Sequence, residues 1–87
     1  MRLKNKRAII TGAGTGIGRS IAERFCTEGA EVMVAEIEIE GGKETVKQII
    51  KSGGKALFQE TDTSKEDSVQ SMIEATVSEF GGIDIVV

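Results

Sequence analysis

Short apolar runs alternate with amphipathic stretches along this chain of 87 residues. Each run has the length of a strand, and an unbroken apolar run is typical of a strand that a sheet buries on both faces. The runs predict four strands, of which the third is the weakest: residues 7–11, 32–35, 56–60 and 83–87.

The amphipathic stretches between these runs carry apolar residues at helical spacing, so they predict three helices. The first stripe consists of Ile17, Ile21, Ala22, Phe25 and Cys26. The second lies in residues 41–52 and consists of Val46, Ile49 and Ile50. The third consists of Val69, Met72, Ile73, Val77 and Phe80.

Glycines and one polar pair indicate where these helices end and begin. Gly29 is a candidate C-cap for the first helix, and glycine pairs at 53–54 and 81–82 close the other two, because glycine enters the left-handed conformation without steric cost. Ser64 stands three residues before Asp67, which is a variant of the capping box and predicts the start of the third helix.

Strict alternation of strands and helices predicts an α/β fold, in which a doubly wound parallel sheet is covered by helices on both faces. Residues 1–87 contain neither a repeat nor a low-complexity stretch, so they form part of one domain. The last run, 83–87, has the character of a strand from the middle of a buried sheet. We therefore expect a domain truncated after its fourth strand, with an exposed edge that favours self-association or marginal stability.

Composition excludes several classes of protein. A single cysteine cannot form an internal disulfide, which favours a reducing, cytoplasmic setting. The net charge of -3 provides no electrostatic footprint for nucleic acid. Every apolar run is far shorter than the ~20 residues of a membrane span, and the basic N-terminus is followed by too short an apolar run for a signal peptide.

The most specific feature is a glycine cluster at residues 11–18, between the first strand and the first helix. The unpaired N–H groups and the dipole at a helix N-terminus attract a pyrophosphate, which side chains would keep away. We expect Gly12 to form the tight turn and Gly16 to let the backbone approach the phosphate. Gly18 would let the helix pack close to the strand.

The spacing of the cluster separates several nucleotide-binding folds. The common Gly-x-Gly-x-x-Gly fingerprint fails, because its third glycine would fall on Ile17 or Arg19. A P-loop is excluded, because no Gly-Lys-Ser/Thr follows. The residues spell Thr-Gly-x-x-x-Gly-Ile-Gly, and in this the chain resembles the short-chain dehydrogenase/reductase family. The resemblance extends to Glu36 and to residues 61–63 and 82–87.

The family resemblance implies a Rossmann-like sheet with strand order 3-2-1-4 and a set of cofactor-binding positions. These positions are Gly12, Thr15, Gly16, Ile17, Gly18, Glu36, Ile37, Asp62 and Thr63. The side chain of Asp62 would bond the adenine amino group, and the backbone at Thr63 would meet the ring. For these two residues helix capping is an alternative role, and Asp84 would have a structural hydrogen-bonding role.

Two other interpretations of the glycine cluster remain. One is a flexible loop whose glycines serve only the turn, although a bare turn needs one or two glycines and this segment has four. The other is an S-adenosylmethionine-dependent methyltransferase, since residues 12–16 also read Gly-x-Gly-x-Gly. Such enzymes usually carry a carboxylate two positions before the first glycine, where this chain has Ile10.

Glu36 favours NAD over NADP. It closes the second strand 18 residues after Gly18, where a carboxylate can accept hydrogen bonds from the adenosine ribose and repel a 2′-phosphate. Neither Thr15 nor Ile37 supplies a basic side chain to hold that phosphate. Alternatively, Glu36 only starts a solvated acidic turn, and Glu38 is the ribose ligand.

Three other side chains have less specific roles. Arg19 is a possible phosphate partner, although a residue beside a helix start more often faces solvent. Cys26 lies in the apolar stripe of the first helix and is expected to act as a small hydrophobic residue. No group of cysteines and carboxylates has the spacing of a metal site or of a nucleophile with its base.

The catalytic residues that the resemblance implies are absent from these 87 residues. The family uses an Asn after the fourth strand, a Ser and a Tyr-x-x-x-Lys pair, whereas this chain has no tyrosine and no histidine. We therefore expect the cofactor-binding half of an enzyme, unable to catalyse a reaction alone. By resemblance the complete enzyme would be a homo-oligomer that interconverts an alcohol and a carbonyl, most like 3-oxoacyl-acyl-carrier-protein reductases. The alternative is a nucleotide-binding module without catalysis.

Overall fold

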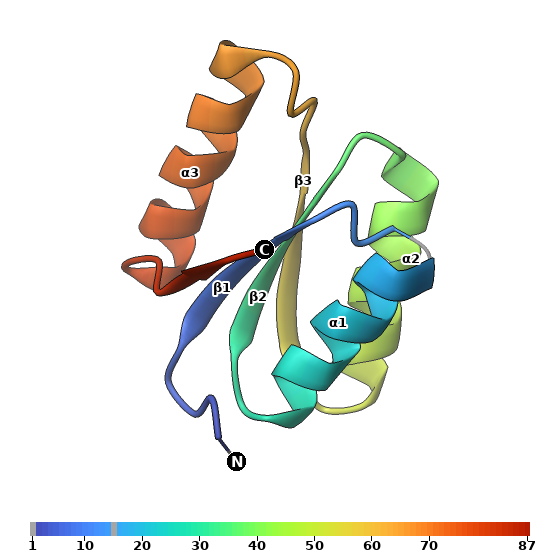
Figure 1. Ribbon diagram of the computed structural model, residues 1–87. Helices are drawn as coiled ribbons and strands as arrows, with labels where there is room; N and C mark the ends of the chain where they lie inside the picture. The colour runs from blue at the N-terminus through green and yellow to red at the C-terminus, as the bar shows by residue number, and fades with distance from the viewer. Residues whose placement is uncertain (1, 15) are drawn as a thin grey trace.

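The computed structural model describes residues 2–14 and 16–87. Within them, strands and helices alternate as predicted (Figure 1). The elements are β1 (Arg7–Thr11), α1 (Gly16–Thr27), β2 (Glu31–Glu36), α2 (Ile39–Lys51), β3 (Lys55–Glu60), α3 (Glu66–Phe80) and β4 (Ile85–Val86).

The strands form one parallel sheet with the predicted order β3-β2-β1-β4. β2 pairs along its length with both β1 and β3, so it is the most enclosed strand. β4 is shorter than the predicted 83–87, since only Ile85 and Val86 pair with β1. Ile83 instead packs against the cluster of side chains beneath α3, which takes it out of the ladder.

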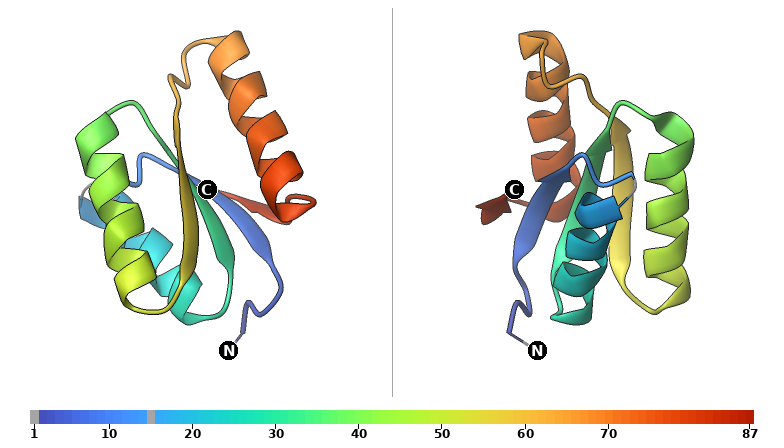
Figure 2. Two further views of the ribbon diagram at one scale, coloured as in Figure 1. Left: turned by 180° about the vertical axis from the view of Figure 1, so that it is seen from behind. Right: turned by 45° about the vertical axis from the view of Figure 1, so that its right-hand side comes forward.

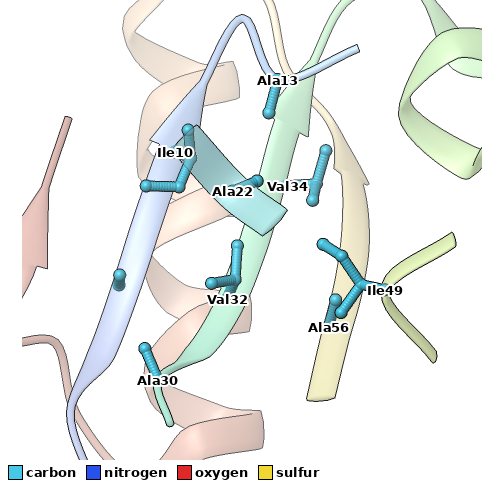
Figure 3. Close-up of a cluster of buried hydrophobic side chains, with 9 residues drawn as sticks. Ile10, Ala13, Ala22, Ala30, Val32, Val34, Ile49 and Ala56 are labelled. Atoms are coloured by element: carbon cyan, nitrogen blue, oxygen red, sulfur yellow. The ribbon is translucent and has the colours of Figure 1, made fainter. Parts of the chain in front are cut away.

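Helices cover both faces of the sheet: α1 and α2 lie on one face, and α3 lies on the other (Figure 2). Successive residues of β1 and β2 point to opposite faces and divide the core into two clusters. The cluster beneath α1 and α2 includes Ile10, Ala22, Val32, Val34 and Ile49 (Figure 3). The cluster beneath α3 is formed by Ile9, Met33, Ala35 and Met72. The doubly wound fold class is confirmed.

Three residues of the predicted helical stripes are not in the core. Ile17 is 81% exposed, because the first turn of α1 stands beside the glycine loop, which joins β1 to α1. The core contacts of this helix begin at Ile21. Ile50 and Val77 are also exposed. Their neighbours Ile49 and Thr76 occupy the buried positions instead, and the Thr76 hydroxyl is satisfied by donating to the Met72 carbonyl at 2.8 Å.

The three predicted helix ends are right, and two predicted helix starts are wrong. Gly29, Gly53 and Gly81 have positive φ values just after α1, α2 and α3. The capping box does not form, because Lys65 is the N-cap residue of α3 and the Ser64 hydroxyl donates to Asp62 instead. α2 begins at Ile39, two residues earlier than predicted, and so includes the glycines at 41 and 42.

Candidate nucleotide-binding site

The segments that follow β1, β2 and β3 meet at the carboxyl ends of these parallel strands. They enclose a cleft of about 270 Å³. In an open parallel sheet this is the place where ligands bind. The cleft is lined by Thr11, Gly12, Ala35, Glu36, Ile37, Thr61, Asp62 and Thr63. Five of the predicted cofactor-binding residues therefore come together here: Gly12, Glu36, Ile37, Asp62 and Thr63.

The glycine loop has the backbone geometry that was expected of it. Gly12 and Gly16 have φ values of 65° and 58°, which side chains with a Cβ rarely adopt. A Cβ on Gly18 would overlap the carbonyl oxygen of Gly12 and lie 2.8 Å from its carbonyl carbon. The start of α1 therefore lies directly against the loop, and only glycine at position 18 allows that approach.

Gly16, Ile17 and Gly18 do not line the cleft. Thr15 lies outside the described residues. Ile17 is in the first turn of α1, where its exposed side chain is available to a ligand. Space is open beside Gly16, because among the described residues, its chain neighbours aside, no heavy atom lies within 4 Å of the position that a Cβ would take. The start of α1 is thus accessible to a ligand.

The Glu36 carboxylate accepts three hydrogen bonds from backbone N–H groups. Gly14 donates to Oε2 at 2.8 Å, and Ile37 and Glu38 donate to Oε1 at 2.9 and 3.2 Å. A Cβ on Gly14 would lie 2.7 Å from Oε2, so the carboxylate rests against the glycine loop. A carboxylate offers roughly four lone-pair positions, so about one remains for a ligand hydroxyl.

This arrangement does not fit a solvated acidic turn at residues 36–40. Glu36 is only partly exposed and bonded to the glycine loop, and the segment is already helical from Ile39. Glu38, the alternative ribose ligand, is exposed and does not line the cleft. Glu36 is therefore the carboxylate of this segment that faces the cleft.

Asp62 is fixed on the other side of the cleft by a tight turn after β3. Its Oδ1 accepts bonds from the Ser64 hydroxyl at 2.6 Å and from the Ser64 N–H at 3.0 Å. These two bonds, led by the hydroxyl, lower the pKa of Asp62. Neither Asp62 nor Thr63 is the N-cap of α3, so the structure gives the capping alternative no support.

Arg19 neither faces solvent nor points at the open side of the glycine loop. Its Nε donates to the Thr45 hydroxyl at 2.8 Å, and its Nη2 donates to the carbonyls of Gly14 and Gly41. The expectation that Arg19 faces solvent is therefore wrong, and its role as a phosphate partner stays a prediction. Its side chain lies behind the loop, between α1 and α2. Thr45 was not singled out from the sequence, since a threonine on a helix carries no signal of a partner 26 residues away.

Two other side chains lie away from the cleft. Burial raises the pKa of the Cys26 thiol to about 11, which fits an inert, partly buried residue. Asp84 stands before β4, and its carboxylate accepts bonds from the Nε and backbone N–H of Arg7 at 3.0 and 2.9 Å. The structural role expected of Asp84 is therefore present in the fold.

The described part of the chain contains no group of three or more histidine, cysteine, aspartate or glutamate side chains that could hold a metal ion. No described helix has both the length and the apolar character to cross a bilayer.

Comparison with known proteins identifies the family. A sequence model of the short chain dehydrogenases matches residues 6–87, which is nearly the whole chain. The chain belongs to the short-chain dehydrogenase family. This membership decides against the methyltransferase interpretation of the glycine cluster.

Individual relatives agree with the family assignment. A short chain dehydrogenase/reductase of Aspergillus oryzae, astE, is 46% identical over 86 residues, which are 98% of this chain and 33% of the relative. The 7alpha-hydroxysteroid dehydrogenase of Escherichia coli K12 is 39% identical over 87 residues, which are 100% of this chain and 34% of that enzyme. This short-chain dehydrogenase sequence thus spans about a third of the length of these relatives. They do not single out 3-oxoacyl-acyl-carrier-protein reductases.

Solved structures of the family match the fold closely. A hydroxysteroid dehydrogenase from Escherichia coli superimposes with a TM-score of 0.96 at 39% identity, over 98% of this chain and 36% of that one. A 7 alpha-hydroxysteroid dehydrogenase complexed with NADH and 7-oxo glycochenodeoxycholic acid gives the same TM-score and identity, over 98% of this chain and 33% of that one.

Proposed function

We propose that this chain is the NAD-binding, N-terminal part of an oxidoreductase that interconverts an alcohol and a carbonyl by hydride transfer. The observation that carries the proposal is the Glu36 carboxylate, held at the cleft beside the glycine loop. Family membership supports the reaction class, and the NADH complex of one similar enzyme supports a nicotinamide cofactor.

The residues present fit a dinucleotide. The close approach at Gly18 and the open space beside Gly16 leave the start of α1 free for a pyrophosphate. There the first N–H groups of the helix and its dipole favour negative charge. The adenosine would lie in the cleft between Ile37 and Asp62, with the adenine amino group on Asp62 and the ring against the backbone of Thr63.

Glu36 is the basis for a preference for NAD over NADP. Its remaining acceptor position suits a ribose hydroxyl of NAD, whereas a 2′-phosphate would bring negative charge against a carboxylate fixed by three N–H groups. The preference should be about tenfold or more in dissociation constant, which corresponds to about 1.4 kcal/mol.

The nicotinamide cofactor would supply the hydride when bound, and this chain's own residues would bind and orient the cofactor. The general acid for the carbonyl oxygen would lie outside these residues, since the chain contains neither tyrosine nor histidine. We propose that the 87 residues form one part of a larger domain and have no activity alone. We also propose a cytoplasmic homo-oligomer that acts on a small molecule; the single cysteine supports the location, and family resemblance supports the assembly.

Binding of NADH and NADPH to the full-length protein tests this proposal, with nucleotide fluorescence as the signal. NADH should bind at least about tenfold more tightly, and Glu36→Gln should reduce this ratio by weakening NADH and strengthening NADPH. Glu38→Gln is the matched control, because it removes the same charge from the next carboxylate outside the cleft and should leave the ratio unchanged. Tighter binding of NADPH by the unaltered protein would overturn the assignment of Glu36.

A further inference from the structure

We propose that Arg19 and Thr45 are positioning residues for nucleotide binding, which fix the glycine loop and, through it, the Glu36 carboxylate. Together they form the loop clamp, which joins α1, α2 and the segment that follows β1. The inference rests on the proposed binding of NAD and adds two residues whose side chains lie behind the loop, away from the cleft.

Thr45 is the centre of the clamp. It lies on α2 with no solvent exposure, and its hydroxyl oxygen accepts the Nε–H of Arg19 at 2.8 Å. The hydroxyl has one hydrogen to donate, and the nearest acceptor is the Ala13 carbonyl at 2.7 Å. The carbonyls of Gly41 and Gly14 are farther away, at 3.1 and 3.4 Å. Thr45 therefore ties the glycine loop to α2.

Arg19 holds the next carbonyl along the loop. Its Nη2 donates to the Gly14 oxygen, and the same nitrogen lies 3.3 Å from the Gly41 oxygen on α2. Hydrogen bonds from a guanidinium are stronger than those between neutral groups, and the planar fork fixes the direction of each one. Two consecutive carbonyl groups of the loop, on Ala13 and Gly14, are thus held from behind.

The planar peptide bond carries this constraint to Glu36. In a trans peptide the carbonyl of Ala13 and the N–H of Gly14 point in opposite directions. A bond from Thr45 to that carbonyl therefore turns the Gly14 N–H toward the other side of the loop. There it donates to Glu36 Oε2 at 2.8 Å. The position of the proposed ribose ligand thus depends on a hydroxyl from the helix behind the loop.

The space around Gly14 leaves the carboxylate little alternative position. A Cβ on Gly14 would lie 2.7 Å from Glu36 Oε2, and a Cβ on Gly41 would lie 3.1 Å from the Gly14 oxygen. Loop, helix and carboxylate are therefore in contact with one another. Loss of the Thr45 hydroxyl would leave a buried carbonyl and a guanidinium N–H without their partner, and the loop would turn to find another.

The test compares Thr45→Val, which has nearly the same shape without the hydroxyl, with Thr45→Ser, which keeps it. In the full-length protein Thr45→Val should raise the dissociation constant of NADH by about tenfold, and Thr45→Ser should bind NADH within about threefold of the unaltered protein. Thr76→Val is the matched control, because Thr76 is also fully buried and bonded to a carbonyl, but on α3. It should leave the affinity for NADH unchanged, whatever its effect on thermal stability.

Arg19→Lys keeps the inference falsifiable if Thr45→Val does not fold. It retains the charge without the fork and should weaken NADH binding by a similar factor. Where Thr45→Val does fold, the two substitutions together should have less than the additive effect. The inference is overturned if Thr45→Val and Arg19→Lys bind NADH like the unaltered protein, or if Thr45→Ser is as weak as Thr45→Val. If the unaltered protein binds neither NADH nor NADPH, the proposed function itself fails. This result is distinct from failure of the inference, which shows only in the variants.

Discussion

Replacement of Gly18 by alanine tests whether the close approach of α1 to the glycine loop is needed for nucleotide binding. The added Cβ would overlap the Gly12 carbonyl oxygen, lie 2.8 Å from the Gly12 carbonyl carbon and lie 3.0 Å from the Cα of Ala13. All three atoms belong to the backbone, so no change of rotamer can relieve the contact. The loop and the helix would have to separate by on the order of 1 Å to restore ordinary carbon–carbon distances.

The expected effect on stability is modest, because two contributions oppose each other. Overpacking costs about 1–3 kcal/mol, whereas alanine is favoured over glycine inside a helix by about 1 kcal/mol. The effect on binding should be larger. A shift on the order of 1 Å would misalign the N–H groups that meet the pyrophosphate, and each hydrogen bond to a charged group contributes about 1.5–3 kcal/mol. The dissociation constant of NADH should therefore rise by about tenfold or more.

The assay is a fluorescence titration with NADH, accompanied by thermal unfolding of each variant. Gly42→Ala is the matched control, because Gly42 is also a helical glycine and its added Cβ would overlap the Phe58 ring on β3, 2.5 Å from Cδ1 and closer still to Cε1. This control should lower the melting temperature and leave the affinity for NADH nearly unchanged. Unaltered NADH binding by Gly18→Ala, or an equal loss of binding in Gly42→Ala, would refute the reasoning.

Four further predictions follow from other parts of the fold. Hydrogen bonds from Arg7 lower the pKa of Asp84, so the pair should stabilise the fold above the ordinary carboxyl pKa, and this stabilisation should be lost as pH falls through the lowered value. Asp84→Asn should remove this acid dependence from the pH profile of unfolding, and an unchanged profile would contradict the assignment. Because burial raises the pKa of Cys26 to about 11, iodoacetamide at pH 8 should modify it much more slowly in the native than in the unfolded protein; equal rates would show an accessible thiolate. The 87-residue chain alone should give only background oxidation of NADH with a broad set of carbonyls, and turnover would show that it contains its own proton donor. Exposed Val86 and Val87 lie at the edge strand β4, so the isolated chain should self-associate in analytical ultracentrifugation, and a stable monomer would contradict this.

The sequence was informative where one short segment determines the structure. Alternating apolar runs were enough to predict the layers and the parallel sheet, and the spacing of Gly12, Gly16 and Gly18 was enough to predict the loop between β1 and α1. These features depend on local periodicity and on backbone conformations that few residues adopt. The family resemblance added the order of the strands.

Features that depend on contacts between distant segments were not predicted. The predicted helix begins only at residue 41, whereas α2 begins at Ile39 and encloses both glycines; Gly42 faces the Phe58 ring and Gly41 faces the glycine loop. Arg19 reaches Thr45 across 26 residues, and neither residue type indicates such a partner. Ser64 bonds to Asp62 in preference to the helix end, because the turn after β3 brings the two together.

A crystal structure of the full-length protein with NADH is the most direct test of the central claim that this chain binds NAD at the carboxyl ends of its strands. The account predicts the pyrophosphate against the backbone at Gly16 and Gly18, and a ribose hydroxyl within hydrogen-bond distance of the Glu36 carboxylate. A nucleotide bound elsewhere on the protein, or an adenosine ribose turned away from Glu36, would contradict it.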